Sequence, residues 1–279
     1  MTDPSVPATS SSYTPVAIEA FHKAVALVEE LIKKIRDELT NLINGVNAFM
    51  QATVDKVADS IFGSVVERFT GDIENNLEAI KGMTEQVRDK VSEILTKAAE
   101  AVAGAVPVAS LFSRGFELNN QVTRPLSGMY GEMTGSGDID FWRGPAKLTY
   151  DKRAKDQQDA ILNATAKVKK LVEYLGQAGA GNMAYMASLG ERLGEIYGSI
   201  VTAVVDLTAI AAGALTQAFA LLAHFSEVIG TVTAELVGYA SQLGARITGV
   251  LDQIMQLEAE KADLTGLKPD GMWPSPVSN

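Results

Sequence analysis

A run of apolar residues with helical spacing dominates the first part of the chain. From Val28 to Ile61, apolar side chains recur at steps of three and four residues, and charged residues fill the positions between them. This pattern is typical of an amphipathic α-helix. At about 1.5 Å per residue, a helix over 16–61 would extend roughly 65–70 Å. Because long helices are stabilised mainly by packing their apolar stripe, the pattern limits this region to packed helices.

A second amphipathic run follows over 65–105. A break between the two runs is expected somewhere in 62–72, where Gly63 and 70–72 are both turn signals. Ser64 and Glu67 have the spacing of a capping box, which marks a helix start. Two runs of matched length joined by a short turn favour an antiparallel helical hairpin. One continuous helix remains the alternative, since these turn signals are weak.

The remainder of the chain also has helical spacing, and no period-two alternation indicates a strand. Pro107 ends the second run, a shorter helix interrupted at Pro125 is expected in 108–132, and 134–140 forms a loop. Helices are expected from Pro145 to about Leu175 and over 182–262, with a break at 176–181. The predicted fold is all-α, an elongated bundle of long antiparallel helices arranged as helical hairpins.

Four segments are expected from these boundaries. The first is a Ser/Thr/Pro-rich disordered segment, and the last is a flexible tail with no helical pattern. Between them lie a long helical hairpin and a helical region that contains a Trp-x-Gly motif and apolar Gly/Ala-rich helices. The four segments are 1–14, 15–106, 107–265 and 266–279.

Composition excludes several classes of function. The 279 residues include no Cys and two His, which argues against thiolate zinc sites, His-based metal sites and a Ser-His-Asp triad. No phosphate-binding loop or catalytic motif occurs, so neither an enzymatic activity nor a cofactor is expected. The net charge of −10 argues against nucleic-acid binding. The N-terminus lacks the basic and apolar regions of a Sec-type signal peptide.

A small motif follows the glycine-rich loop. Trp142, Gly144, Ala146 and Tyr150 form the pattern Trp-x-Gly-x-Ala-x-x-x-Tyr at the junction between the loop and a helix. Gly144 would allow a close approach between elements, and Trp142 would fill the adjacent gap. A capped helix with a core tryptophan is the simpler interpretation of these residues.

In an acidic, Cys-free, helical chain, this motif resembles the Trp-x-Gly proteins exported by actinobacterial type VII (ESX) secretion systems. The stretch 112–230 is most similar to the EspA- and EspE-like secretion-associated proteins, whereas 16–105 has no counterpart in that resemblance. The resemblance implies a secreted or envelope-associated protein, cytoplasmic before export and linked to virulence. None of the seven Tyr residues is followed at the fourth position by Asp or Glu, the export signal of such substrates. A small helical-hairpin partner or chaperone is therefore expected to supply the signal.

An uncharged apolar segment runs for 17 residues from Leu207 to Ala223, at the lower limit for a membrane span. No Lys or Arg lies between Arg192 and Arg246, so the flanking positive charges typical of a span are missing. A helix buried on most sides, over 199–232, is one interpretation. Insertion of this stretch into a membrane is the other.

Two further patterns concern contacts between helices or molecules. Gly190, Gly194 and Gly198 fall every four residues, which suits close helix packing within the chain or contact between copies in a homo-oligomer. Residues 143–170 contain eight basic and three acidic residues, a local charge of +5. That excess fits a solvated helix face or a docking surface for an acidic partner or anionic headgroups.

Three functions are compatible with these features. The first is a non-enzymatic type VII substrate that acts in assembly or partner binding at the cell envelope or outside the cell. The second is a membrane-active, pore-forming type of helical protein that inserts 199–232. The third is a cytosolic coiled-coil scaffold with an accidental Trp-x-Gly motif.

Overall fold

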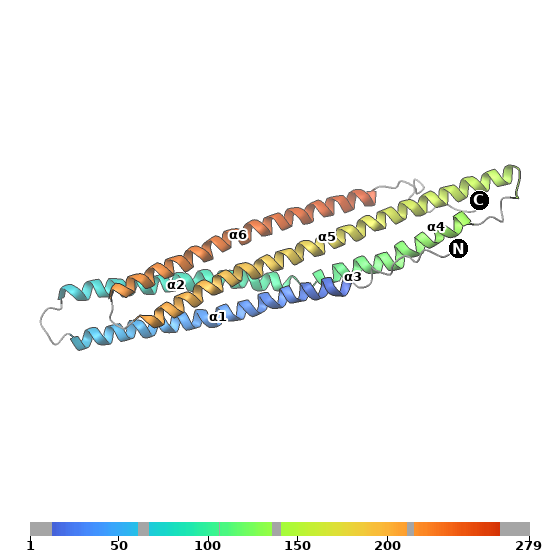
Figure 1. Cartoon of the computed structure of the whole chain (residues 1–279). Coiled ribbons are helices and arrows are strands. Elements are labelled where there is room, and N and C mark those ends of the chain that lie inside the picture. Colours follow the sequence, from blue (N-terminus) through green and yellow to red (C-terminus); the bar gives the residue numbers. More distant parts are fainter. Residues whose placement is uncertain (1–12, 61–66, 106, 136–140, 211–214, 263–279) are drawn as a thin grey trace. The chain divides into compact units, whose positions relative to one another are not determined.

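The computed structural model describes residues 13–60, 67–105, 107–135, 141–210 and 215–262. Within these ranges every regular element is a helix and no strand occurs, so the predicted all-α class is confirmed. Figure 1 shows the elements in chain order. They are α1 (Tyr13–Ser60), α2 (Glu67–Ala103), α3 (Val108–Leu118), the π-helix η1 (Asn119–Thr123), α4 (Arg124–Gly135), α5 (Pro145–Ala209) and α6 (Leu215–Ala262).

The chain divides into two units, and α1, α5 and α6 contribute residues to both of them. Unit 1 comprises Met1–Glu19, Pro107–Asn182 and Ala245–Asn279, and unit 2 comprises Ala20–Val106 and Met183–Gly244. Unit 2 thus contains most of α1, all of α2 and adjoining parts of α5 and α6.

The core of unit 2 consists of side chains that recur at alternating steps of four and three residues. This heptad-like spacing places them on one face of each helix. On α1 the buried set runs from Val28 to Thr53, on α2 from Ile80 to Ala98 and on α5 from Leu189 to Leu207. The buried Thr53 and Thr84 hydroxyls donate to the carbonyl groups of Phe49 and Ile80, four residues earlier, which satisfies them locally. The amphipathic helices predicted over 16–61 and 65–105 therefore occur, with apolar faces that are buried.

Contacts between named residues give the directions of two helix pairs in unit 2. Leu27 and Val28 of α1 lie beside Gly190 of α5, and Gly45 lies beside Leu207, so α1 and α5 run in the same direction. On α5 and α6, Ser188 contacts Gln242, while Asp206 contacts His224. These two helices are therefore antiparallel.

Unit 1 has fewer buried side chains. Phe112 of α3 lies against Gly179 of α5, and Gly115 lies against Val172 and Leu175, so α3 and α5 are antiparallel. Lys170 of α5 forms an ion pair with Glu260 of α6. Along the part of α6 that belongs to unit 1, Val250, Leu251, Ile254 and Met255 are exposed.

Two expectations about helix boundaries are wrong. Helix α5 continues through the predicted break at 176–181. The expected interruption at Pro125 is a π-helix, η1, which ends just before it. Of the two turn signals considered in 62–72, the one at 70–72 lies within α2. The region predicted to be helical over 182–262 contains the end of α5, at Ala209, and α6, which begins at Leu215. Ser64 and most of the predicted 134–140 loop lie outside the described residues.

Candidate functional site

The turn before α5 has a backbone conformation that glycine adopts most readily. Gly144 has φ +94°, in the left-handed region, and a Cβ placed here would have no described atom within 4 Å beyond its chain neighbours. Its carbonyl accepts hydrogen bonds from the amides of Lys147 and Leu148 at 3.1 and 3.4 Å. Pro145 follows as the first helical residue, where its missing N–H costs nothing. Glycine is therefore needed here for its conformation, and not to allow close packing.

Two aromatic residues of the motif meet beside this turn. The ring centroids of Trp142 and Tyr150 are 6.0 Å apart, with the planes tilted by 59°. Trp142 is 53% exposed and Tyr150 is 40% exposed. Ala146 is exposed as well. The aromatic pair thus packs against itself on the surface of unit 1, and neither ring is enclosed in a core.

Phe141, which precedes Trp142, was not among the predicted site residues. With 86% of its surface exposed, it is the most exposed of the large apolar side chains that the structure describes. The signal for it was present in the sequence, as a Phe-Trp pair between a glycine-rich loop and a helix-starting proline. Phe141 extends the aromatic surface beyond the four motif residues.

The predicted glycine stripe on α5 is used unevenly. Gly190 is buried, and a Cβ there would lie 3.4 Å from Leu27 Cδ2 of α1. At Gly194 and Gly198 such a Cβ would meet no described atom of another helix within 4 Å, and Gly198 is exposed. One of the three glycines therefore allows a close helix contact within the chain.

The apolar segment from Leu207 to Ala223 spans the end of α5 and the start of α6. Leu207 is buried and Ala223 is exposed. Burial in the described part of 199–232 follows one face, which includes Ile200, Phe225 and Val232, while Val205 is exposed. The expectation of a helix buried on most sides is therefore not met where the structure describes this stretch. The centre of the segment, 211–214, lies outside the described residues.

A different stretch has the length and composition of a membrane helix. It lies within Glu74–Met133, and 29% of its apolar 18-residue window is buried. Core helices of soluble proteins have the same length and composition.

Polar contacts in unit 2 join α5 to α6, and none of them was predicted from the sequence. Arg192 of α5 forms an ion pair with Glu235 of α6, whose side chain is 12% exposed. The hydrogen bond and the charge of Glu235 raise the pKa of the Glu195 carboxyl above its usual value. Arg192 is the only Lys or Arg between Lys170 and Arg246, and this isolation was the available sequence signal.

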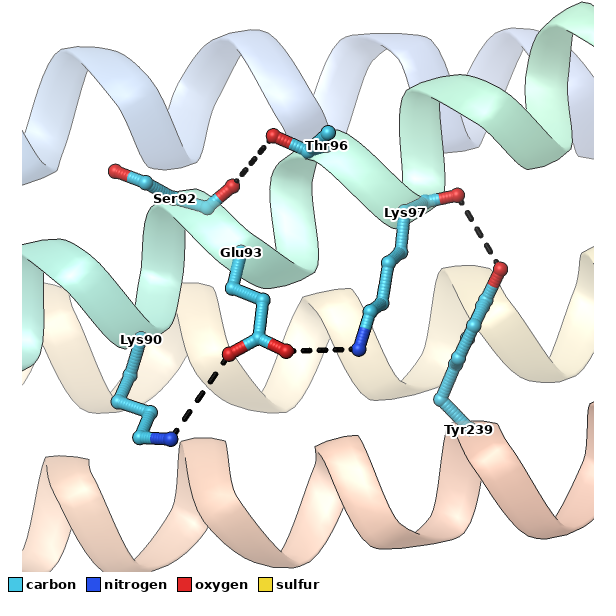
Figure 2. Close-up of polar contacts among 6 residues, drawn as sticks. All are labelled: Lys90, Ser92, Glu93, Thr96, Lys97 and Tyr239. Atoms are coloured by element: carbon cyan, nitrogen blue, oxygen red, sulfur yellow. Dashed lines mark hydrogen bonds and ion pairs between the residues drawn. The ribbon is translucent and has the colours of Figure 1, made fainter.

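One hydrogen bond joins α2 to α6, as Figure 2 shows. The Tyr239 hydroxyl donates to the carbonyl oxygen of Lys97 at 3.3 Å. Lys97 Nζ lies 2.8 Å from Glu93, and Lys90 Nζ lies 3.9 Å from the other oxygen of the same carboxylate. The hydrogen bond from Lys97 lowers the pKa of Glu93. The Tyr239 hydrogen bond thus joins α6 to α2, whereas both ion pairs of Glu93 lie within α2.

The described residues contain no group of three or more His, Cys, Asp or Glu side chains placed to hold a metal ion. A cavity of about 150 Å³ lies between α1 and α2, lined by apolar Ile43, Val46 and Met50 and by charged Lys81, Glu85 and Arg88. Typical small-molecule sites have about 300–1,000 Å³, so this cavity is too small for most ligands.

The comparisons with known proteins give no relative. No protein-family model, no curated protein and no solved structure matches the chain.

Proposed function

We propose that this chain is a non-enzymatic helical protein exported by a type VII secretion system, with the turn before α5 as its recognition surface. The observation that carries the proposal is the exposure of the aromatic pair. Trp142 is 53% exposed although it lies directly against Tyr150. A tryptophan used only for core packing would be largely enclosed, whereas an aromatic residue used for recognition has to be accessible.

The backbone supports the same proposal. Gly144 adopts a positive φ, and its carbonyl accepts hydrogen bonds from the amides of Lys147 and Leu148, so the turn leads directly into α5. This turn places Trp142 beside Tyr150 on the surface of unit 1. The proposed partner is a small helical-hairpin protein that carries the export signal, which none of the seven Tyr residues of this chain provides.

The experiment is to express the chain in a strain that has a type VII system and to measure the fraction in the culture filtrate. Deletion of the secretion ATPase should leave the chain in the cytoplasm, whereas deletion of a Sec component should not change its export. Equal amounts in the filtrate with and without the ATPase would contradict the proposal. Retention in the cytoplasm of both strains would favour the coiled-coil scaffold.

Membrane activity is the second candidate function, and one observation favours it. A helical stretch within Glu74–Met133 is long and apolar enough to cross a bilayer, in addition to the apolar segment at 207–223. Release of a trapped dye from liposomes is its direct test. If the vesicles are saturated with protein and still retain the dye, the chain does not form a pore.

A further inference from the structure

The turn before α5 exposes more apolar surface than the motif requires. Phe141 is 86% exposed and Leu148, on the first turn of α5, is 72% exposed. Phe141, Trp142 and Leu148 are three exposed apolar side chains at the start of α5 in unit 1, and we name them the tip patch. Large exposed apolar groups gathered in one place are uncommon on soluble proteins and mark sites of interaction.

Basic residues lie next to the tip patch in the sequence. Arg143, Lys147, Lys152, Arg153 and Lys155 lie within 143–155, where Asp151 is the one acidic residue, so the local charge is +4. Asp151 pairs with Lys147 at 2.8 Å. Asp138 and Asp140 precede the patch in the sequence and lie outside the described residues. Along α5 the basic residues from Lys147 to Lys155 extend over about 12 Å, at about 1.5 Å per residue.

This local charge opposes that of the whole molecule. The chain carries −10 overall, and between 171 and 260 it has nine acidic residues against two basic ones. At physiological salt, interactions between exposed charges that lie more than about 8 Å apart are largely screened. A charged surface that approaches the tip patch therefore meets mainly the charges next to it, which are the basic cluster with Asp151 and with Asp156, the residue that follows Lys155.

We propose that the tip patch docks unit 1 onto the surface of an anionic lipid bilayer. Phe141 and Trp142 enter the interfacial region, where aromatic side chains are favoured, and the basic residues of α5 contact anionic headgroups. Neither the insertion of the aromatic side chains nor the attraction of the basic residues suffices alone, because stable attachment of a peripheral protein combines both. This inference is independent of the proposed export function, because it concerns the surface on which the protein acts.

The combination of groups favours a bilayer over an acidic protein as the occupant. An acidic protein would be held by the basic residues but would leave Phe141 without an apolar partner. A bilayer accepts both, because its interface places an apolar region directly beneath its charges. The docking is peripheral and needs no helix to cross the membrane.

Sedimentation of the full-length chain with vesicles tests the proposal. The vesicles contain phosphatidylcholine alone or a 7:3 mixture with phosphatidylglycerol, and the salt is 0.15 or 0.5 M NaCl. We expect binding to the anionic vesicles at low salt, and at least tenfold weaker binding to neutral vesicles or at high salt. Equal binding to both kinds of vesicle, or no binding to either, would overturn the proposal.

Four variants locate the binding surface. Phe141→Ser and the pair Lys152→Glu/Lys155→Glu should each weaken binding to anionic vesicles at least tenfold. Two controls should stay within twofold of the wild type. Met255→Ser removes an apolar side chain from the exposed face of α6 in the same unit, and Lys33→Glu/Lys90→Glu reverses the same number of charges in unit 2. Loss of binding in the controls, or wild-type binding by the tip-patch variants, would contradict the assignment.

Trp142 also reports on its own surroundings. The chain has two tryptophans, so Trp273→Phe leaves Trp142 as the sole tryptophan fluorophore. Its emission should shift to the blue with anionic vesicles and be quenched by brominated lipids. An unshifted emission during binding would overturn the proposal. Because Lys152→Glu/Lys155→Glu leaves the motif intact, it should lose vesicle binding while its export stays at the wild-type level, which separates this inference from the proposed function.

Discussion

The guanidinium group of Arg192 on α5 lies where a side chain at position 238 on α6 would have to fit. A Cβ added to Gly238 would meet the Arg192 nitrogen and carbon atoms at contact distances that real Cβ atoms do not show. From this position Arg192 reaches Glu235, one helical turn before Gly238. The absence of a side chain at 238 therefore allows the ion pair between α5 and α6.

Replacing Gly238 by Ala should displace Arg192 and break the ion pair. We expect a loss of about 1–3 kcal/mol in the free energy of unfolding, because the largely buried Glu235 loses its partner. In an Arg192→Ala background the same change should instead stabilise by about 0.5–1 kcal/mol, since alanine favours a helix over glycine. Chemical denaturation of the wild type, Gly238→Ala, Arg192→Ala and the double variant measures the free energy of unfolding of each. A Gly238→Ala effect of the same sign and size in both backgrounds would refute the role given to Arg192.

Position 230 provides the matched control on the same helix. A Cβ added to Gly230 of α6 would meet no described atom of another helix within 4 Å. Gly230→Ala should therefore increase stability by about 0.5–1 kcal/mol through helix propensity alone.

The carboxyl pair of Glu195 and Glu235 should make the stability of unit 2 depend on pH. Glu235 raises the pKa of Glu195 above the ordinary value of 4.5, so the native state holds this proton more tightly than the unfolded chain. The resulting stabilisation is complete below pH 4.5 and is lost as the pH rises through the raised pKa. Glu195→Gln keeps a hydrogen-bond donor at every pH. Its melting temperature should match the wild type near pH 4 and exceed it at pH 7.

Thermal melting across this pH range checks the sign. Glu29→Gln, which removes one charge from an exposed position on α1, should show no such growing difference. A Glu195→Gln variant that is less stable than the wild type at pH 7 would be inconsistent with repulsion between the two carboxylates.

The apolar stripe of α2 should contribute strongly to stability. Ile80 is completely buried in unit 2, so Ile80→Ala should lower the free energy of unfolding by about 2–5 kcal/mol. Val54→Ala on α1 removes methyl groups from a half-exposed position and should cost less than about 0.5 kcal/mol. Calorimetry or urea denaturation distinguishes them. Similar melting of both variants would mean that the stripe does not form a core.

The helices with regular apolar spacing could be predicted from the sequence because burial follows the same period. Val28, Leu42 and Val46 belong to the predicted stripe and are buried. Glycine positions predicted the ends of helices less well than apolar spacing predicted the helices. The 176–181 stretch remains helical, because propensity is a weak prior, about 1 kcal/mol per glycine, that tertiary contacts override. At Gly179 the contact is with the ring of Phe112.

The π-helix, the ion pair between α5 and α6 and the exposure of the aromatic pair could not be predicted from the apolar spacing. The π-helix before Pro125 widens the turn where proline lacks an N–H and its ring would crowd the carbonyl of Gln121. The pairing of Arg192 with Glu235 joins residues 43 positions apart, and composition cannot indicate it. At the candidate site, the positions of Trp142 and Tyr150 beside one another agree with their spacing, but their exposure depends on how little of unit 1 covers them.

The export of Trp142→Ala tests the central claim most directly. Because Trp142 is more than half exposed, the variant should lose less than about 1 kcal/mol of stability, against about 3–5 kcal/mol for a core tryptophan. Leu148→Ala, at an even more exposed position on the first turn of α5, is the control. The melting temperature and the secreted fraction are measured for both variants in the same strain. We predict that Trp142→Ala folds with a nearly unchanged melting temperature and stays in the cytoplasm, while Leu148→Ala is exported. A folded Trp142→Ala exported at the wild-type level would contradict the account.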